Sequence, residues 1–219
     1  MPNYSGIWTV TQQMQAKGQS LWPSQPLVIG EAYGGGFYAG QIGVSGVATH
    51  NLVVGPRASA QNNSIQWKTS NTSTAGTTSV INGPANSTAM NDVTHPAAQF
   101  CEGLTVGSQT DWYMPAKNEL EVCYYNLKPT TDVNSTSSGI NANAVPARAS
   151  NYTSGTPAQT SAAIFVTSTG TEAFFPALYW SSTENSSVYG WAQYFGAGSQ
   201  YGTGKLYSRY VRAIRRVAV

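Results

Sequence analysis

Residues 111–120 read DWYMPAKNEL, an aromatic run that leads into the start of a predicted helix. Pro115 suits the first helical position, where no backbone N–H has to be donated. The residues that follow repeat apolar side chains at the spacing of one helical face: Ala116, Leu120, Cys123, Tyr124 and Leu127. Pro129 closes the pattern. The sequence therefore predicts a helix over residues 115–129 that buries one face on a sheet.

A second helix is predicted just upstream. Pro96 lies near its first position, and Gly107 lies just beyond its end. Its apolar face is formed by Ala97, Phe100, Cys101 and Leu104. This helix is also expected to pack on a sheet.

Strand-like sequence lies on both sides of the two helices. Runs of β-type residues occupy 27–29, 37–42 and 52–54 before the helices, and 163–166, 178–182, 190–195 and 206–217 after them. The three glycines at 34–36 could suggest a phosphate-binding loop, but no GK[ST] follows and a strand comes next, so a hairpin turn or bulge is favoured. Residues 61–90 and 130–163 are poor in large apolar side chains and are expected to form long surface loops.

The composition favours a folded, β-rich protein. Charged residues make up only 9% of the chain, against about 25% in an ordinary globular domain. The 13 Tyr, 6 Trp and 6 Phe nevertheless supply more apolar surface than a disordered chain carries. This composition, low in charged residues and rich in aromatic residues, is typical of many extracellular or virion-surface proteins. We expect one main domain over residues 28–219, preceded by a short segment, residues 1–27, that acts as a strap on this domain or as an anchor to another protein.

Charge and hydropathy argue against several classes of function. The formal net charge of +2 is too small to indicate nucleic-acid binding. The amino terminus lacks the basic and apolar regions of a secretory signal, and no run of about 18 apolar residues predicts insertion into a membrane. His50 and His95 have no ligands near them at zinc spacing, so no metal and no cofactor is predicted. Cys101 and Cys123 are expected to be free buried thiols, with a disulfide between packed helices as the alternative.

Three segments together resemble a known family. DWYMPAKNEL at 111–120 is similar to the motif DWYLP-x-x-x-EL, and YWSSTE at 179–184 followed by VRAIRR at 211–216 is similar to the ending YWSSTE…VRAVR. These motifs are typical of the C-type-lectin-like domain at the carboxy terminus of a bacterial collagen-like adhesin and in many bacteriophage virion proteins. The resemblance extends over roughly residues 29–217.

The resemblance implies an α+β, C-type-lectin-like fold with two helices packed on small antiparallel sheets and long loops on one side. It also implies display on a bacteriophage virion, as a tail or fibre component and as a trimer, after assembly in the host cytoplasm. Residues 1–27 would then bind other virion proteins, and the main domain would bind a glycan or protein of the host surface. The alternative is a head decoration or joint protein with a purely structural role.

The chain departs from the pattern of the calcium-dependent lectins. Those proteins use EPN or QPD and a downstream WND to give calcium its oxygen ligands, and the first two tripeptides do not occur here. Calcium-mediated sugar binding is therefore not expected. A related fold belongs to the oxidase that makes formylglycine with active cysteines, but the apolar neighbours of Cys101 and Cys123 favour core packing instead.

The carboxy-terminal stretch is the predicted binding site. Its rings alternate with Ser, Gly, Asn and Gln, a mixture that gives contact area at low entropic cost. Trp180 and Trp191 are assigned to the core. The predicted ligand-binding residues are those flanked by glycine or small polar residues, together with one arginine: Tyr189, Gln200, Tyr201, Tyr207 and Arg209.

Five of the 11 basic residues fall between 205 and 216. On one strand, Lys205, Arg209 and Arg215 would point to one face, and Arg212 and Arg216 to the other, which argues against a single anion-binding patch. The resemblance gives Arg212 and Arg215 structural roles, with Glu184 or Glu119 as suggested partners.

Catalysis has little support in the sequence. The carboxylates that could form an acid–base pair are Asp111, Glu119, Glu121 and Glu184. No nucleophile motif or metal cluster accompanies them, so the protein is not expected to be an enzyme, and glycan hydrolysis is the remaining alternative.

Overall fold

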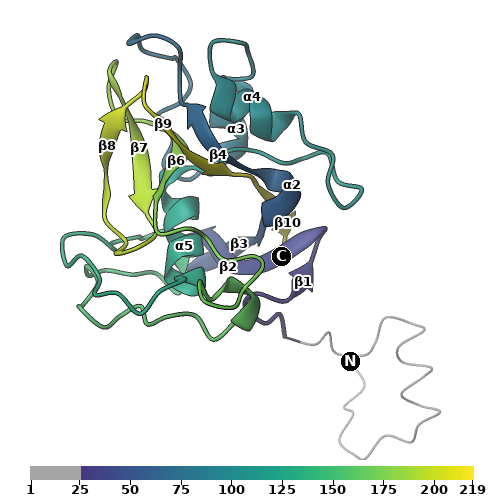
Figure 1. Cartoon of the computed structure of the whole chain (residues 1–219), viewed down its shortest axis with the longest axis vertical. Coiled ribbons are helices and arrows are strands. Elements are labelled where there is room, and N and C mark those ends of the chain that lie inside the picture. The colour runs from purple at the N-terminus through teal and green to yellow at the C-terminus, as the bar shows by residue number, and fades with distance from the viewer. Residues whose placement is uncertain (1–25) are drawn as a thin grey trace, which may run out of the picture.

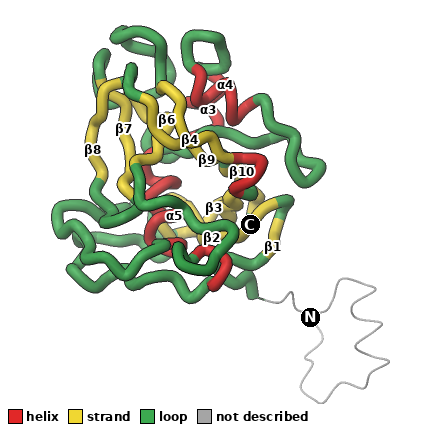
Figure 2. The backbone as a smooth tube through the Cα atoms, in the orientation of Figure 1, coloured by secondary structure: helices red, strands yellow, loops and turns green. Residues whose placement is uncertain are grey.

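The computed structural model describes residues 26–219 and shows a mixed α+β architecture (Figures 1 and 2). One five-stranded sheet has the order β1 (Ala32–Tyr33), β2 (Gly36–Val44), β3 (Val47–Val54) and β10 (Ile214–Ala218), with β5 (Ala144–Val145) also paired to β2. The other has the order β4 (Gln61–Gln66), β9 (Ser208–Arg212), β6 (Leu178–Glu184), β7 (Tyr189–Tyr194) and β8 (Gln200–Gly204). The α+β prediction is confirmed.

Four α-helices lie within the described residues. They are α2 (Arg57–Ala60), α3 (Gly83–Thr88), α4 (Pro96–Glu102) and α5 (Lys117–Leu127). The two longest, α4 and α5, confirm the two predicted helices. Helix α5 begins two residues after Pro115, because Ala116 is extended and its N–H donates to the Glu119 carboxylate at 2.7 Å.

Helix α5 lies against strands of both sheets (Figure 1). Its predicted apolar face is buried in a core cluster, where it meets residues of β2 and β3 such as Ile42 and Leu52. Tyr179 of β6 and Phe195, which follows β7, belong to the same cluster. Each fully buried side chain of this size stabilises the fold by about 1.5–3 kcal/mol, before entropy is subtracted.

A second core cluster contains three buried tryptophans, Trp67, Trp112 and Trp180, together with the apolar face of α4. Segment 111–120 joins the two clusters, because Trp112 belongs to the second cluster and Tyr113 to the first. The Tyr113 N–H donates to Ile214 O at 2.9 Å, and Ile214 N donates to Tyr113 O at 3.0 Å. The DWYMP run therefore also holds the start of β10.

Gly34 and Gly35 form a hairpin turn between β1 and β2, as predicted, and Gly36 begins β2. Gly34 and Gly35 have φ values of 56° and 84°, a region that is strained for other residues. Both cysteines are free and buried, and they lie in different core clusters, so the disulfide alternative is wrong.

Three strand predictions are wrong. Residues 27–29 form no strand, because the chain turns at Gly30 (φ 83°), whose N–H donates to Tyr38 O. Residues 163–165 form a 3₁₀ turn, η1 (Ala163–Phe165), which directs Phe165 into the core. The single strand predicted over 206–217 is two strands in different sheets, separated at Ala213, which bonds to Ala60 O and Gly55 N.

The two predicted surface loops are wrong in part. Residues 61–90 contain β4 and α3. Residues 130–163 bury Asn134, Asn141 and Tyr152 beside α5, where Tyr124 Oη donates to Asn134 Oδ1 at 2.6 Å. Polar side chains whose hydrogen bonds are all made can thus be buried in the core. The pattern of apolar residues in the sequence does not reveal them.

The predicted anchor or strap, residues 1–27, lies outside the described residues except for its last two. Among the helices of residues 26–219, none has the length and hydropathy needed to cross a membrane.

Candidate binding site

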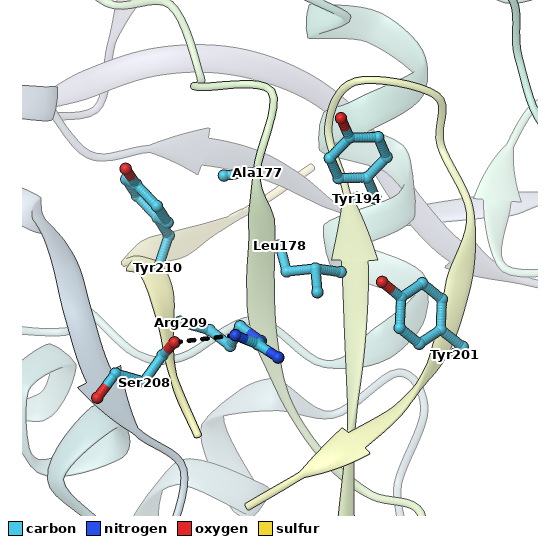
Figure 3. A pocket seen from close by; sticks show the side chains of 7 residues that line it. All are labelled: Ala177, Leu178, Tyr194, Tyr201, Ser208, Arg209 and Tyr210. Atoms are coloured by element: carbon cyan, nitrogen blue, oxygen red, sulfur yellow. Dashed lines mark hydrogen bonds between the residues drawn. The ribbon is translucent and has the colours of Figure 1, made fainter. Parts of the chain in front are cut away.

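A pocket of about 320 Å³ lies over the second sheet. Figure 3 shows its side chains, which come from four neighbouring strands, β8, β7, β6 and β9, and from Ala177 just before β6. They are Ala177, Leu178, Tyr194, Tyr201, Ser208, Arg209 and Tyr210. Three tyrosine rings and one guanidinium thus meet at a single opening.

The strand register explains why these side chains meet. Leu178 pairs with Tyr194, and Ala192 pairs with both Trp180 and Tyr201. Because side chains alternate between the faces of a strand, Leu178, Tyr194 and Tyr201 share the face on which Trp180 is buried. Trp180 Nε1 donates to Ile65 O at 2.9 Å, which fixes the base of this face. The pocket walls therefore stand on a rigid sheet.

Arg209 differs from the other basic residues of residues 205–216. Lys205 pairs with Glu184, Arg212 with Glu172, Arg215 with Asp111, and Arg216 with Glu119. Within the described part of the chain, Arg209 has no carboxylate partner. Its Nη1 and Nη2 donate only to Ser208 O (3.3 Å) and Thr203 Oγ1 (3.4 Å), and its buried Nε has no partner there. The pocket thus holds a cation whose hydrogen-bonding capacity is largely unused.

Comparison with protein-family models matches residues 58–215 to the Lcl C-terminal domain, the C-terminal domain of the Legionella collagen-like protein. The chain belongs to this family. The match covers segments 111–120 and 179–184, all but the last residue of segment 211–216, and all the pocket residues, whereas β1, β2 and β3 precede it. A comparison with curated proteins found no match.

The Lcl C-terminal domain brings three of the five predicted ligand-binding residues together. Tyr201 and Arg209 line the pocket, and Arg209 Cζ lies 5.1 Å from the Tyr207 ring centroid. Tyr201 is 44% exposed and Tyr207 61% exposed. Tyr189, 47% exposed, is not among the pocket-lining residues. Gln200 follows the alternation to the opposite face from Tyr201, and its Nε2 donates to Lys117 O at 3.0 Å.

Sequence reasoning missed Leu178, Tyr194 and Tyr210 as parts of the Lcl C-terminal domain pocket. Their types alone do not set them apart, because the chain has 13 tyrosines. Leu178 and Tyr194 meet through the register of β6 with β7, and Tyr210 lies beside them because β9 pairs with β6. The assignment of Trp191 to the core is wrong in part, since its ring is half-buried and carries the Lys117 ammonium 4.2 Å above it.

The suggested partners of Arg212 and Arg215 are wrong. Arg212 binds Glu172 at 2.7 Å, and Arg215 binds Asp111 at 2.6 Å. The guanidinium of Arg215 holds the pKa of Asp111 below its ordinary value. The predicted division of the basic residues between two faces also fails at Ala213, because β9 and β10 belong to different sheets.

The candidate acid–base carboxylates all have protein partners. Glu119 accepts from Tyr113 Oη at 2.5 Å and from Arg216 Nε at 2.7 Å, while burial raises its pKa. Glu121 accepts from Tyr152 Oη at 2.6 Å and from Arg148. Glu184 accepts from Lys205. Among residues 26–219, no group of three or more His, Cys, Asp or Glu side chains could hold a metal ion.

Proposed function

We propose that this chain is a binding protein with a C-type-lectin-like fold, which attaches a bacteriophage tail or fibre to a glycan on the host surface. Membership of the Lcl C-terminal domain family and the virion-type motifs support the class. The packing of α5 against strands of two small sheets supports the lectin-like arrangement, because the resemblance implies helices packed on small antiparallel sheets. One observation supports the binding role: among the described residues, Arg209 has no carboxylate partner, and it lies in a pocket walled by tyrosines.

The chemistry of this pocket suits a sugar residue that bears a carboxylate. The rings of Tyr194, Tyr201 and Tyr210 offer apolar faces to the C–H surface of a sugar, and Leu178 extends the apolar wall. A guanidinium donates two parallel N–H bonds to a carboxylate, which would complete the bonding of Arg209. The walls stand on paired strands, so little ordering entropy opposes binding.

The test measures binding of galacturonic acid to the full chain by calorimetry, with its methyl ester as the uncharged probe. We expect Tyr201→Leu and Arg209→Met each to weaken binding of the acid about tenfold, equal to about 1.4 kcal/mol. Tyr189→Leu is the matched control, because it removes an equally exposed ring outside the pocket. Equal effects of Tyr189→Leu and Tyr201→Leu would overturn the pocket assignment.

The virion role has its own test. An antibody against the chain should label the tails or fibres of purified bacteriophage particles in electron micrographs. Labelling confined to the head would favour the decoration role instead. If no particle is labelled, the virion role is wrong. The pocket assignment is tested separately by the calorimetry.

A further inference from the structure

An exposed aromatic ring continues the pocket beyond Tyr210. Phe175 is 37% exposed, and its ring centroid lies 5.6 Å from that of Tyr210. The planes of the two rings are tilted by 46° to each other. Such an apolar ring left in contact with water beside a binding pocket offers a second stacking surface.

A second guanidinium lies at the far end of this pair of rings. Arg57 Cζ lies 5.3 Å from the Phe175 ring centroid. Arg57 Nη1 donates to Ala173 O at 3.3 Å. The nearby Glu172 carboxylate already pairs with Arg212, and its bond to Arg57 is made by the backbone N–H at 2.6 Å. In the described part of the chain, the Arg57 guanidinium therefore has no salt-bridge partner.

Both groups are held in place by buried neighbours. The Phe175 N–H donates to Tyr179 Oη at 3.0 Å, and Tyr179 is fully buried in the core. The backbone of Arg57 is fixed by the bond to Glu172, whose partner Arg212 is also buried. These groups are thus positioned before any ligand arrives, which lowers the entropic cost of binding.

We propose that the pocket is one end of a longer groove that continues past Tyr210, in which Phe175 and Arg57 bind the second and later residues of an acidic oligosaccharide. The proposal rests on the glycan-binding function proposed above and extends it from a single sugar to a chain. Each step from Tyr210 to Phe175 and from Phe175 to Arg57 is comparable to the width of one sugar ring. Arg209 and Arg57 would each receive a carboxylate.

The experiment titrates the full chain with galacturonic acid and with its α-1,4-linked oligomers of two to six residues. We expect the affinity of the unmodified protein to rise with length up to three or four residues. Phe175→Leu and Arg57→Gln should each leave monomer binding unchanged and weaken tetramer binding by about tenfold, as expected for loss of one stacked or charged contact. Tyr201→Leu should weaken every length alike, and Tyr189→Leu should change none.

The outcomes separate the groove from the pocket. If the monomer binds but affinity does not rise with length, or if Phe175→Leu and Arg57→Gln weaken monomer and tetramer equally, the groove is overturned and the pocket stands. If no length binds to the unmodified protein, the proposed glycan function fails and the groove fails with it. Far-ultraviolet circular dichroism and urea midpoints confirm that each variant is folded. If Phe175→Leu does not fold, the effect of Arg57→Gln on tetramer binding tests the groove alone.

Discussion

Arg212 Nη2 lies 2.7 Å from Glu172 Oε2, and the Arg212 side chain is completely shielded from water. The same guanidinium donates to Gly55 O at 2.8 Å and to Glu172 O at 2.6 Å, and its Cζ lies 4.7 Å from the Phe174 ring centroid. Burial lowers its pKa to about 10, so it remains charged at neutral pH. Arg212 therefore joins β9, the end of β3 and the loop that carries Phe175.

Arg212→Met should strongly destabilise the protein. Removal of one partner of a buried ion pair leaves the other charge without compensation and costs about 3–5 kcal/mol. Urea unfolding followed by circular dichroism measures this loss. Arg209→Met is the matched control, because Arg209 has no carboxylate partner in the described residues, and its loss should cost less than about 1 kcal/mol. Equal costs for the two variants would contradict the role given to Arg212.

Local signals in the sequence predicted α4, α5 and the first hairpin, but not α2 or α3. Pro96, Pro115 and the apolar faces gave α4 and α5 because capping and helical spacing act within a few residues. The break at Ala213 could not be predicted, because nothing in residues 206–217 changes the β pattern. It arises from pairing with Gly55 and Ala60, some 150 residues away in the chain. Long-range pairing therefore overrode a uniform local pattern.

The site was predictable only in part for the same reason. Exposure of Tyr201 and Tyr207 followed from their small polar neighbours. The placement of Tyr189 on the opposite face from Tyr201 depends on the register of β7 with β8, and the inclusion of Tyr194 depends on the register of β6 with β7. The partners of Arg212 and Arg215 lie 40 and 104 residues away in the sequence, so local patterns could not predict them.

Three glycines allow the cost of a side chain to be separated from the cost of backbone strain. Gly40 has φ 114°, and an added Cβ would lie 2.3 Å from Asn126 Nδ2 of α5. Gly46 has φ 79°, and an added Cβ there would meet no atom of residues 26–219 within 4 Å. An added Cβ at Gly155 would also meet none of them, and Gly155 has no positive φ. We expect Gly40→Ala to cost about 2–4 kcal/mol, Gly46→Ala about 1 kcal/mol and Gly155→Ala nothing measurable. Urea midpoints test this order, and a cost for Gly155→Ala equal to that of Gly40→Ala would contradict it.

The cysteines should report global unfolding. Both are fully buried, and burial raises the pKa of each thiol, so neither a reagent nor the reactive thiolate is available in the folded state. We expect no reaction with an aromatic disulfide reagent under native conditions and two thiols per chain after denaturation. Cys101→Ser and Cys123→Ser should each reduce the denatured count by one. Rapid labelling of either thiol in the native protein would show that its core cluster opens locally.

The ionised carboxylate of Asp92 should stabilise the folded state at neutral pH but not at strongly acidic pH. The Thr94 hydroxyl at 2.6 Å and the His95 ring at 2.9 Å lower the pKa of this carboxyl to about 2. Its unfolded value is about 3.9, so the folded state holds the charged form more strongly. The stabilisation is complete above the unfolded value and is lost as pH falls toward about 2. Asp92→Asn should therefore lower the thermal midpoint at pH 7 and have a smaller effect at pH 2, as measured by scanning calorimetry.

Glu102 should show the opposite dependence. Burial at the end of α4 raises the pKa of its carboxyl, and the structure gives it no salt bridge within residues 26–219. The folded state then binds the proton more tightly than the unfolded state, so stability is greatest below the unfolded pKa and falls as pH rises through the folded value. Glu102→Gln removes the charge that burial disfavours. It should raise the thermal midpoint at pH 7 and leave it unchanged at pH 3, whereas a lower midpoint at pH 7 would mean that Glu102 has a cationic partner in solution.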